Sequence, residues 1–392
     1  MLIAKDADGR LINLTSIRND HSDLLHRLRE KTHYCPVCEH PLDLKAGSIK
    51  ILHFAHQKLK SCRIEHESES DYHLNGKIQL YLWLKSQDMV QTEMERYFPE
   101  IMQRPDVYTD TGQRKIAVEF QCSSIPAAQF YKRTSQYKQA NIEPLWILGA
   151  KNAVRLSSST FRISPFQWLF VKQGPEILGP PHLLSYCSSL QAFLLIEHLI
   201  PFSKQVFTSI PSVKPIRHIT LSDVSPQAVP SPKNWIQWLN LIKMHRLKPH
   251  IHLSGELKSL QQTLYEKKQV PLSCLPSEAF IPVATGYLFH TAVYVWQTKI
   301  LLFIDSLSGH SVFRLEDAVN EMKRDRHIVR RDISHMKHVS IGAPVRAYLE
   351  ALAQRGLIAK ENKYSYRKTA DLKWSQNQEE LLKRDNDLLC KR

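Results

Sequence analysis

Two acidic residues have the types and the spacing of a metal site. Asp106 follows a proline and leads into an apolar segment, and Glu119 lies in the next apolar segment, after the turn-forming residues Asp110-Thr111-Gly112. Two strands joined by such a turn lie side by side, so both carboxylates can approach one divalent cation. Oxygen ligands of this kind suit Mg²⁺ or Mn²⁺, which bind phosphates and activate water.

The neighbours of Glu119 favour a functional role for it. Glu119 stands between Val118 and Phe120, where burying an unpaired carboxylate would be costly. The simpler alternative is that Asp106 only ends a strand and Glu119 is a paired surface acid. Gln121 projects from the same sheet face as Glu119, because side chains alternate along a strand. Glutamine can orient a water molecule by hydrogen bonds but has no charge.

Three polar residues recur four positions apart in an expected helix. Glu69, His73 and Lys77 would form one stripe on a helix over about residues 67–85. A solvated face with ordinary charge pairing would explain the stripe equally well. If the stripe faces the strands that contain the two acids, Glu69 can approach the cation, with His73 and Lys77 nearer the phosphate. Either Lys77 then supplies the positive charge that Gln121 lacks, or catalysis is slower.

The surrounding elements follow a definite order. After the helix the pattern predicts three strands, a second helix and a fourth strand, at residues 90–97, 105–109, 115–121, beyond Pro126 and 145–148. This α-β-β-β-α-β order, with Pro-Asp and Glu-x-Gln on successive strands, resembles the core of the PD-(D/E)xK nucleases. Arg133 and Tyr137 lie four residues apart on the second helix. They could bind a phosphate or pack on the sheet.

A cysteine- and histidine-rich segment precedes this core. Cys35 and Cys38 form a Cys-x₂-Cys pair, followed by His53 and His56 in a His-Phe-Ala-His element. Two thiolates ahead of two imidazoles are typical of tetrahedral Zn²⁺, with buried thiols and core histidines as the alternative. Because His-x₂-His is tighter than the common spacing, Cys62 is an alternative fourth ligand. Zinc would stabilise this small module, since about thirty residues bury little core unaided.

The rest of the chain divides into two segments. We expect an N-terminal hairpin and zinc module over residues 1–65, the nuclease-like core over 66–152, and a loop-rich α/β region over 153–310. That region should contain an apolar helix near 190–199, a helix near 235–245 and strands within 280–305.

The last segment, residues 311–392, has a basic character. Two helices with apolar faces precede a Gly-Leu-Ile sequence and a basic aromatic hairpin, an order that resembles a winged helix-turn-helix end. DNA contact there would use the hairpin cations Lys360, Lys363, Arg367 and Lys368. A purely structural cap is the alternative.

Composition restricts the class of protein. The 392 residues have a formal net charge of +15, which indicates an anionic partner. Seven cysteines in so long a chain do not form a disulfide scaffold. We expect a cytoplasmic protein without membrane insertion, because no signal peptide is visible. The apolar run over 286–304 is interrupted by polar residues and predicts paired strands.

Taken in chain order, these motifs resemble those of the competence protein CoiA family: Cys-Pro-x-Cys, His-Phe-Ala-His, Glu69-Ser-x-x-His73-x-x-x-Lys77, Pro105-Asp106 and Val118-Glu119-Phe120-Gln121. The match is specific to about residue 150 and weaker beyond it. The resemblance implies a nuclease fold acting on single-stranded or branched DNA alongside the recombinase machinery. Asp106, Glu119 and Gln121 would match the nuclease motif, and Glu69 the first-helix acid.

Two hypotheses about activity follow. The first is a metal-dependent deoxyribonuclease that uses Mg²⁺ or Mn²⁺. The second is a DNA-binding accessory protein that supports recombination without cutting. Gln121, where most PD-(D/E)xK proteins have lysine, is the feature that divides them. A third hypothesis is a zinc-containing transcription regulator that uses the winged-helix-like end.

Overall fold

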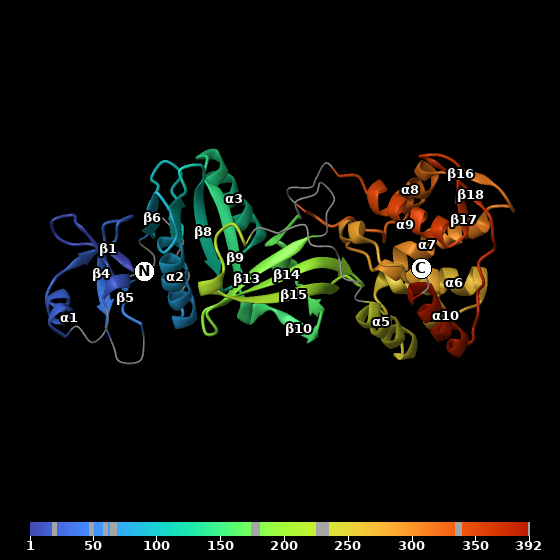
Figure 1. Ribbon diagram of the computed structural model, residues 1–392, viewed down its shortest axis with the longest axis horizontal. Coiled ribbons are helices and arrows are strands. Elements are labelled where there is room, and N and C mark those ends of the chain that lie inside the picture. Colours follow the sequence, from blue (N-terminus) through green and yellow to red (C-terminus); the bar gives the residue numbers. More distant parts are fainter. Residues whose placement is uncertain are drawn as a thin grey trace.

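The protein is described from a computed structural model, which covers residues 1–17, 22–46, 51–57, 62, 69–173, 181–224, 235–333 and 339–390. Three parts follow one another along the long axis (Figure 1). They are a small N-terminal sheet, a central domain around a large sheet, and a mainly helical C-terminal region. This is a mixed α/β protein.

The N-terminal part is an antiparallel five-stranded sheet with the order β2-β1-β3-β4-β5. Its elements are β1 Ile3–Lys5, β2 Leu11–Asn13, α1 Ser22–Arg29, β3 His33–Tyr34, β4 Pro41–Lys45 and β5 His53–His56. The expected hairpin around Asp8-Gly9 is confirmed, because β1 pairs with β2 and Gly9 takes the positive φ of +79° that such a turn needs.

The central domain begins with the predicted α-β-β-β-α-β order. Its elements are α2 Asp71–Lys85, β6 Gln91–Met94, β7 Val107–Asp110, β8 Lys115–Gln121, α3 Ala127–Gln139 and β9 Glu143–Gly149. Ser70 caps α2 by accepting a hydrogen bond from the backbone of His73. The expected start of this helix near residue 67 lies outside the described residues.

The two helices cover opposite faces of this sheet. The helix α2 lies on the side of the sheet that faces the N-terminal part (Figure 1). Phe120 of β8 is buried and packs against Gly76 of α2. Its neighbour Glu119 points the other way, because side chains alternate along a strand, and contacts α3. Successive side chains of β8 therefore face α2 and α3 alternately.

Gly76 of α2 packs directly on Phe120, and a Cβ atom there would lie 2.0 Å from the Phe120 ring. We expect Gly76→Ala to destabilise the domain by about 1–3 kcal/mol, because the buried ring has no room to move. In an exposed helix the same change would be stabilising. Urea unfolding should show the loss. Gly309→Ala is the matched control, since no atom lies within 4 Å of its Cβ position. Equal stability of both variants would show that α2 sits further from the strand.

The sheet continues well beyond β9, which corrects the expected helix near 190–199. That segment is a strand, β14, paired on both sides. The added elements are β10 Val154–Ser157, β11 Thr160–Arg162, α4 Pro165–Trp168, β12 Val171–Lys172, β13 His182–Cys187, β14 Ala192–Pro201 and β15 Val206–Pro215. The order is β10-β11-β15-β14-β13-β9-β8-β7-β6, with β12 on β13. A boundary after residue 152 thus falls inside the sheet.

The C-terminal region is mainly helical, and the strands expected within 280–305 are wrong. The apolar run forms α7, which is buried all round and so lacks the alternation that separates a helix from a strand. The helices are α5 Trp235–Leu247, α6 Gly255–Lys268, α7 Val293–Ser306, α8 Leu315–Arg324, α9 Gly342–Gln354 and α10 Gln378–Cys390. None of the described helices combines the length and apolar character that a membrane crossing requires.

A three-stranded sheet accompanies the last helices. Its strands are β16 Val312–Arg314, β17 Ile358–Lys360 and β18 Ser365–Lys368, in the order β16-β18-β17. Two helices and then a hairpin therefore occur as expected. Residues 325–341 separate α8 from α9, however, so the short turn of a helix-turn-helix does not join them.

Candidate active site and Cys/His cluster

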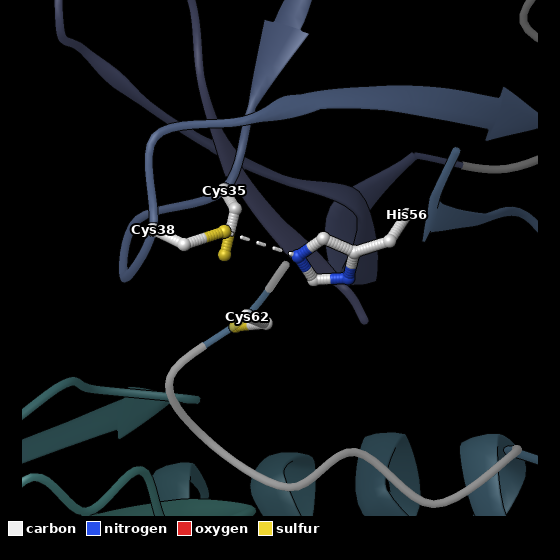
Figure 2. A group of neighbouring side chains, drawn as sticks. All are labelled: Cys35, Cys38, His56 and Cys62. Carbon is white, nitrogen blue, oxygen red and sulfur yellow. Dashed lines mark hydrogen bonds between the residues drawn. The ribbon is translucent and has the colours of Figure 1, made fainter. Parts of the chain in front are cut away.

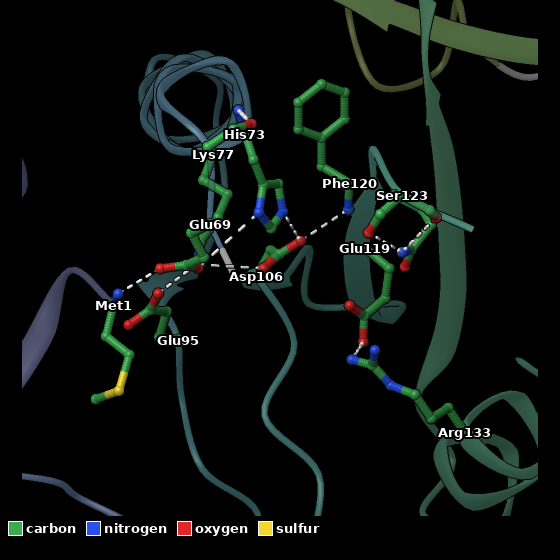
Figure 3. Close-up of polar contacts among 12 residues, drawn as sticks. Met1, Glu69, His73, Lys77, Glu95, Asp106, Glu119, Phe120, Ser123 and Arg133 are labelled. Atoms are coloured by element: carbon green, nitrogen blue, oxygen red, sulfur yellow. Dashed lines mark hydrogen bonds and ion pairs between the residues drawn. The ribbon is translucent and has the colours of Figure 1, made fainter. Parts of the chain in front are cut away.

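Asp106 and Glu119 lie at one end of the β7–β8 pair. Val107 is opposite Val118, a register that places Asp106 across from Glu119. The Oδ2 atom of Asp106 accepts a hydrogen bond from the backbone N–H of Phe120 at 2.9 Å (Figure 3). Glu119 therefore lies on β8 with Asp106 beside it. Asp106 is directed toward α2, whereas Glu119 contacts α3.

Of the expected helical stripe, His73 and Lys77 lie on α2, whereas Glu69 precedes the helix and its cap Ser70. All three side chains face the acids and are largely shielded from solvent (Figure 3). The Nζ atom of Lys77, which is buried, lies 2.5 Å from Oε1 of Glu69 and 3.3 Å from Oδ1 of Asp106, and also contacts Glu95. The Nε2 atom of His73 lies 3.4 Å from Oδ2 of Asp106. The buried ammonium group of Lys77 thus contacts three carboxylates, and the N-terminal ammonium group of Met1 also pairs with Glu69.

The charges of this cluster fix its protonation. Burial alone would raise the pKa of each carboxyl group, but the charge of Lys77 outweighs it. The pKa of Asp106 is held well below its usual range, with His73 assisting, and so is that of Glu69. The pKa of Glu95 is lowered to about 2. Burial would lower the pKa of Lys77, yet its acidic partners raise it. All four groups are therefore ionised at neutral pH.

Glu95 and Arg104 belong to this site, although neither was predicted from the sequence. Glu95, which follows β6, accepts hydrogen bonds from the backbone N–H groups of Leu2 at 2.9 Å and Ile3 at 3.2 Å. Burial would lower the pKa of Arg104, but the charges of Glu95 and Glu69 raise it. The cluster thus joins the N-terminal sheet to the central domain. Only an acid after a strand and an arginine before Pro-Asp mark these residues in sequence.

Glu119 is held from the other side of the sheet. Its Oε1 atom accepts hydrogen bonds from Arg133 and Tyr137 of α3. Burial raises the pKa of Glu119 to about 7, opposed by the charge of Arg133 and reinforced by that of Asp106. Of the two alternatives for Tyr137, phosphate contact or packing on the sheet, its burial fits packing, and Arg133 binds the acid. Gln121 donates to the backbone oxygen of Ser123 at 2.9 Å.

The donor set suits a hard divalent cation by type, since Asp106, Glu119 and Glu69 all offer carboxylate oxygens. Among the described residues, however, these donors do not form a group of three or more ligand atoms within 4.8 Å of one another. Lys77 and Arg133 compensate them in their present arrangement. A cation would therefore compete with Lys77 for the carboxylate of Asp106 and with Arg133 for that of Glu119.

A Cys/His cluster lies in the N-terminal part (Figure 2). The ligand atoms of Cys35, Cys38, His56 and Cys62 all lie within 4.8 Å of one another, with Cys38 Sγ 3.4 Å from His56 Nε2. His53, the expected ligand, is not among them, and its Nδ1 atom bonds the backbone oxygen of Ile51 at 2.7 Å. Residues three apart on β5 point to opposite faces, which leaves Cys62 as the fourth member.

Burial raises the pKa of the Cys35 thiol, but the pKa values of two other members of the cluster are shifted in the direction that metal binding needs. Burial lowers the pKa of His56, which keeps its imidazole neutral. Burial would raise the pKa of Cys38, but hydrogen bonds from His40 and the neighbouring thiols lower it. Three thiols and one neutral imidazole are a known zinc-ligand set, so this group could hold zinc structurally.

The cations of the C-terminal hairpin are mostly engaged within the protein. Lys368 is buried and donates a hydrogen bond to the backbone oxygen of Leu307 at 2.9 Å. Its position does not fit the predicted DNA contact and agrees with the alternative of a structural cap. Lys360 and Arg367 each form an ion pair with a glutamate at 2.7 Å. Lys363, in contrast, is exposed. The hairpin alone therefore offers fewer unpaired cations than its sequence indicates.

Comparison with known proteins covers most of the chain. Three family models match in succession: the N-terminal domain of competence protein CoiA over residues 17–65, its nuclease-like domain over 69–228 and its C-terminal domain over 235–382. The competence protein CoiA of Bacillus subtilis (strain 168) is 36% identical over 348 residues, which cover 87% of this chain and 90% of that protein. No solved structure matches. The nuclease-like match spans the whole large sheet and the acidic cluster.

Proposed function

The chain belongs to the competence protein CoiA family, and on that premise we propose that its nuclease-like domain is a metal-dependent deoxyribonuclease of the PD-(D/E)xK type. Its substrates would be single-stranded or branched DNA intermediates of natural transformation and recombination, processed in the cytoplasm alongside the recombinase machinery. The observation that supports this most directly is the register of β7 and β8, which sets Asp106 across from Glu119.

The side chains have separate roles in this proposal. Asp106 and Glu119, with Glu69, would hold Mg²⁺ or Mn²⁺, which lowers the pKa of bound water and neutralises charge on the phosphate. The ammonium group of Lys77 lies 3.3 Å from Asp106. Its positive charge would reduce the repulsion between the three carboxylates and the reacting phosphate. His73 holds the other oxygen of Asp106 in place. Gln121 orients the water by hydrogen bonding.

One observation favours the accessory function instead. Gln121 already donates to Ser123, and Glu119 is held by Arg133 and Tyr137. If these contacts persist with DNA bound, the metal site stays weak, and the protein would bind DNA without cutting it. For cleavage, the cation would have to compete with Arg133 and Tyr137 for the carboxylate of Glu119, where both bond Oε1.

The test is cleavage of labelled single-stranded, duplex and branched DNAs with Mg²⁺, with Mn²⁺ and with EDTA. We expect products with a divalent cation and none with EDTA. Retained DNA binding without cleavage in either metal would reject the nuclease and support the accessory function.

We also propose that residues 1–65 form a zinc-binding module. Purified protein should contain about one zinc per chain, and Cys62→Ser should lose it, because a closed site needs all four ligands. His53→Ala should keep the metal, since His53 lies outside the cluster. Metal analysis and thermal unfolding check both variants. Zinc loss in His53→Ala but not in Cys62→Ser would reverse the ligand assignment.

A further inference from the structure

A cavity of about 900 Å³ lies in the C-terminal region, far along the chain from the acidic cluster. The end of β16, the start of α8, the first turns of α9 and the β17–β18 turn surround it. Its polar lining includes Arg314, Arg346, Asn362 and Tyr364, with Glu316 and Glu350 also present. Its size is within the range of about 300–1,000 Å³ that is typical of ligand sites.

Tyr364 gives this cavity an accessible aromatic surface. Tyr364 is 51% exposed, and its backbone oxygen accepts a hydrogen bond from Leu315 at the start of α8 at 2.8 Å. The guanidinium carbon of Arg346 lies 5.3 Å from the centre of its ring, and the ammonium group of Lys363 lies 5.4 Å from it. Both distances are within cation–π range, so two positive charges are held next to one exposed ring.

The cations around Tyr364 differ from the others of the hairpin. Among the described residues, Arg314, Arg346 and Lys363 have no ion-pair partner, whereas Lys360 and Arg367 are each paired with a glutamate. The Nε atom of Arg346 is buried and has no hydrogen-bond partner in the described part of the chain.

The acidic residues leave this positive charge largely uncancelled. Glu350 is bound to Lys360, so Glu316 is the acid of the lining without an ion-pair partner among the described residues. The N-terminal end of α9 lines the same cavity, and the helix dipole there also favours negative charge. The site is therefore suited to an anion that brings a flat ring with it.

From these observations we propose that this surface binds single-stranded nucleic acid, with a base stacked on Tyr364 and the backbone phosphates at Arg346, Lys363 and Arg314. Exposed aromatic rings next to unpaired cations are the combination by which proteins bind single strands without sequence preference. Duplex DNA keeps its bases stacked on each other, so it could use the cations but not the ring. This site goes beyond the proposed nuclease and does not require cleavage.

The test is binding of the full-length protein to labelled oligo(dT) in EDTA, measured by fluorescence anisotropy. Tyr364→Ala should weaken binding roughly tenfold, because the stacking surface is lost, and Tyr364→Trp should restore it. Arg346→Ala should weaken binding by a similar factor and make the affinity less dependent on salt, since one phosphate contact is lost. Thermal unfolding checks that each variant is folded.

Arg367→Ala is the matched control, because it removes one positive charge from the same hairpin but from an existing ion pair. Its affinity should stay within about twofold of the wild type. Unchanged affinity in Tyr364→Ala, or an equal loss in Arg367→Ala, would overturn the proposal. The proposal would also be overturned if Tyr364→Ala weakened the binding of duplex DNA as much as that of oligo(dT). The same holds if polyglutamate displaced labelled oligo(dT) as well as unlabelled oligo(dT) does. Because EDTA prevents cleavage, a failed nuclease assay leaves this result intact.

Discussion

Asp106→Asn protein should bind DNA like the wild type but should not cut it. Asparagine keeps the shape of the side chain and can still accept the hydrogen bond from the backbone of Phe120. It removes the charge that a divalent cation needs, so we expect cleavage to fall by at least roughly 1,000-fold. DNA affinity should change little, because a metal ligand acts mainly on the transition state. Lys77 keeps its contacts with Glu69 and Glu95, so the domain should remain folded.

Asp110→Asn provides the matched control for this variant. Asp110 ends the same strand, β7, and its carboxylate accepts a hydrogen bond from the backbone of Gly112 at 2.8 Å and forms no ion pair with a described residue. An asparagine there preserves the turn, and cleavage should match the wild type. Both rates should be measured in parallel on one DNA, after equal purification, to exclude a contaminating nuclease. Cleavage by Asp106→Asn at the wild-type rate would remove Asp106 from the active site.

The part of the fold that sequence predicted well has strong local signals. The strand over Lys115–Gln121 was expected with the bounds that the structure shows, because a turn precedes it and a proline-started helix follows it soon after. Signals of this kind failed for β14 and α7. Both are mainly apolar and largely buried, one between two strands and one within a helical core, so hydrophobic periodicity does not distinguish strand from helix there.

The sequence predicted the parts of the candidate site whose residues lie close together along the chain. Asp106 and Glu119 share a hairpin, so their approach follows from one turn. Glu95 depends on Leu2, which lies 93 residues away, and no local pattern announces such a contact. Tyr137 had the helical spacing of a surface residue, but its hydroxyl group is used to hold Glu119. Tertiary contacts determine the roles of Glu95 and Tyr137, and such contacts cannot be inferred from local patterns in a single sequence.

Lys77→Met should be the most damaging single change in the central domain. Lys77 is buried and lies against three carboxylates, and methionine fills a similar volume without charge. Removing one partner of a buried ion network leaves charge uncompensated, which destabilises a protein by about 3–5 kcal/mol. Urea unfolding near neutral pH should show this loss. Lys360→Met is the control, because its ion pair with Glu350 is exposed and contributes little.

The effect of pH separates loss of charge compensation from loss of packing. In the wild type the pKa values of Glu69, Glu95 and Asp106 are lowered, so their stabilising contribution is present at neutral pH and is lost as pH falls below about 4. Without Lys77 these buried carboxyl groups should take up protons more readily, and their raised pKa values make the variant more stable as pH falls. The gap between variant and wild type should therefore narrow from about pH 7 to about pH 5. A gap that stays constant would mean that Lys77 stabilises by packing alone.

The same variant also tests catalysis. If Lys77→Met is folded near pH 7 yet cleaves no DNA, Lys77 provides the charge that Gln121 cannot. A fully active variant would assign that function to another residue.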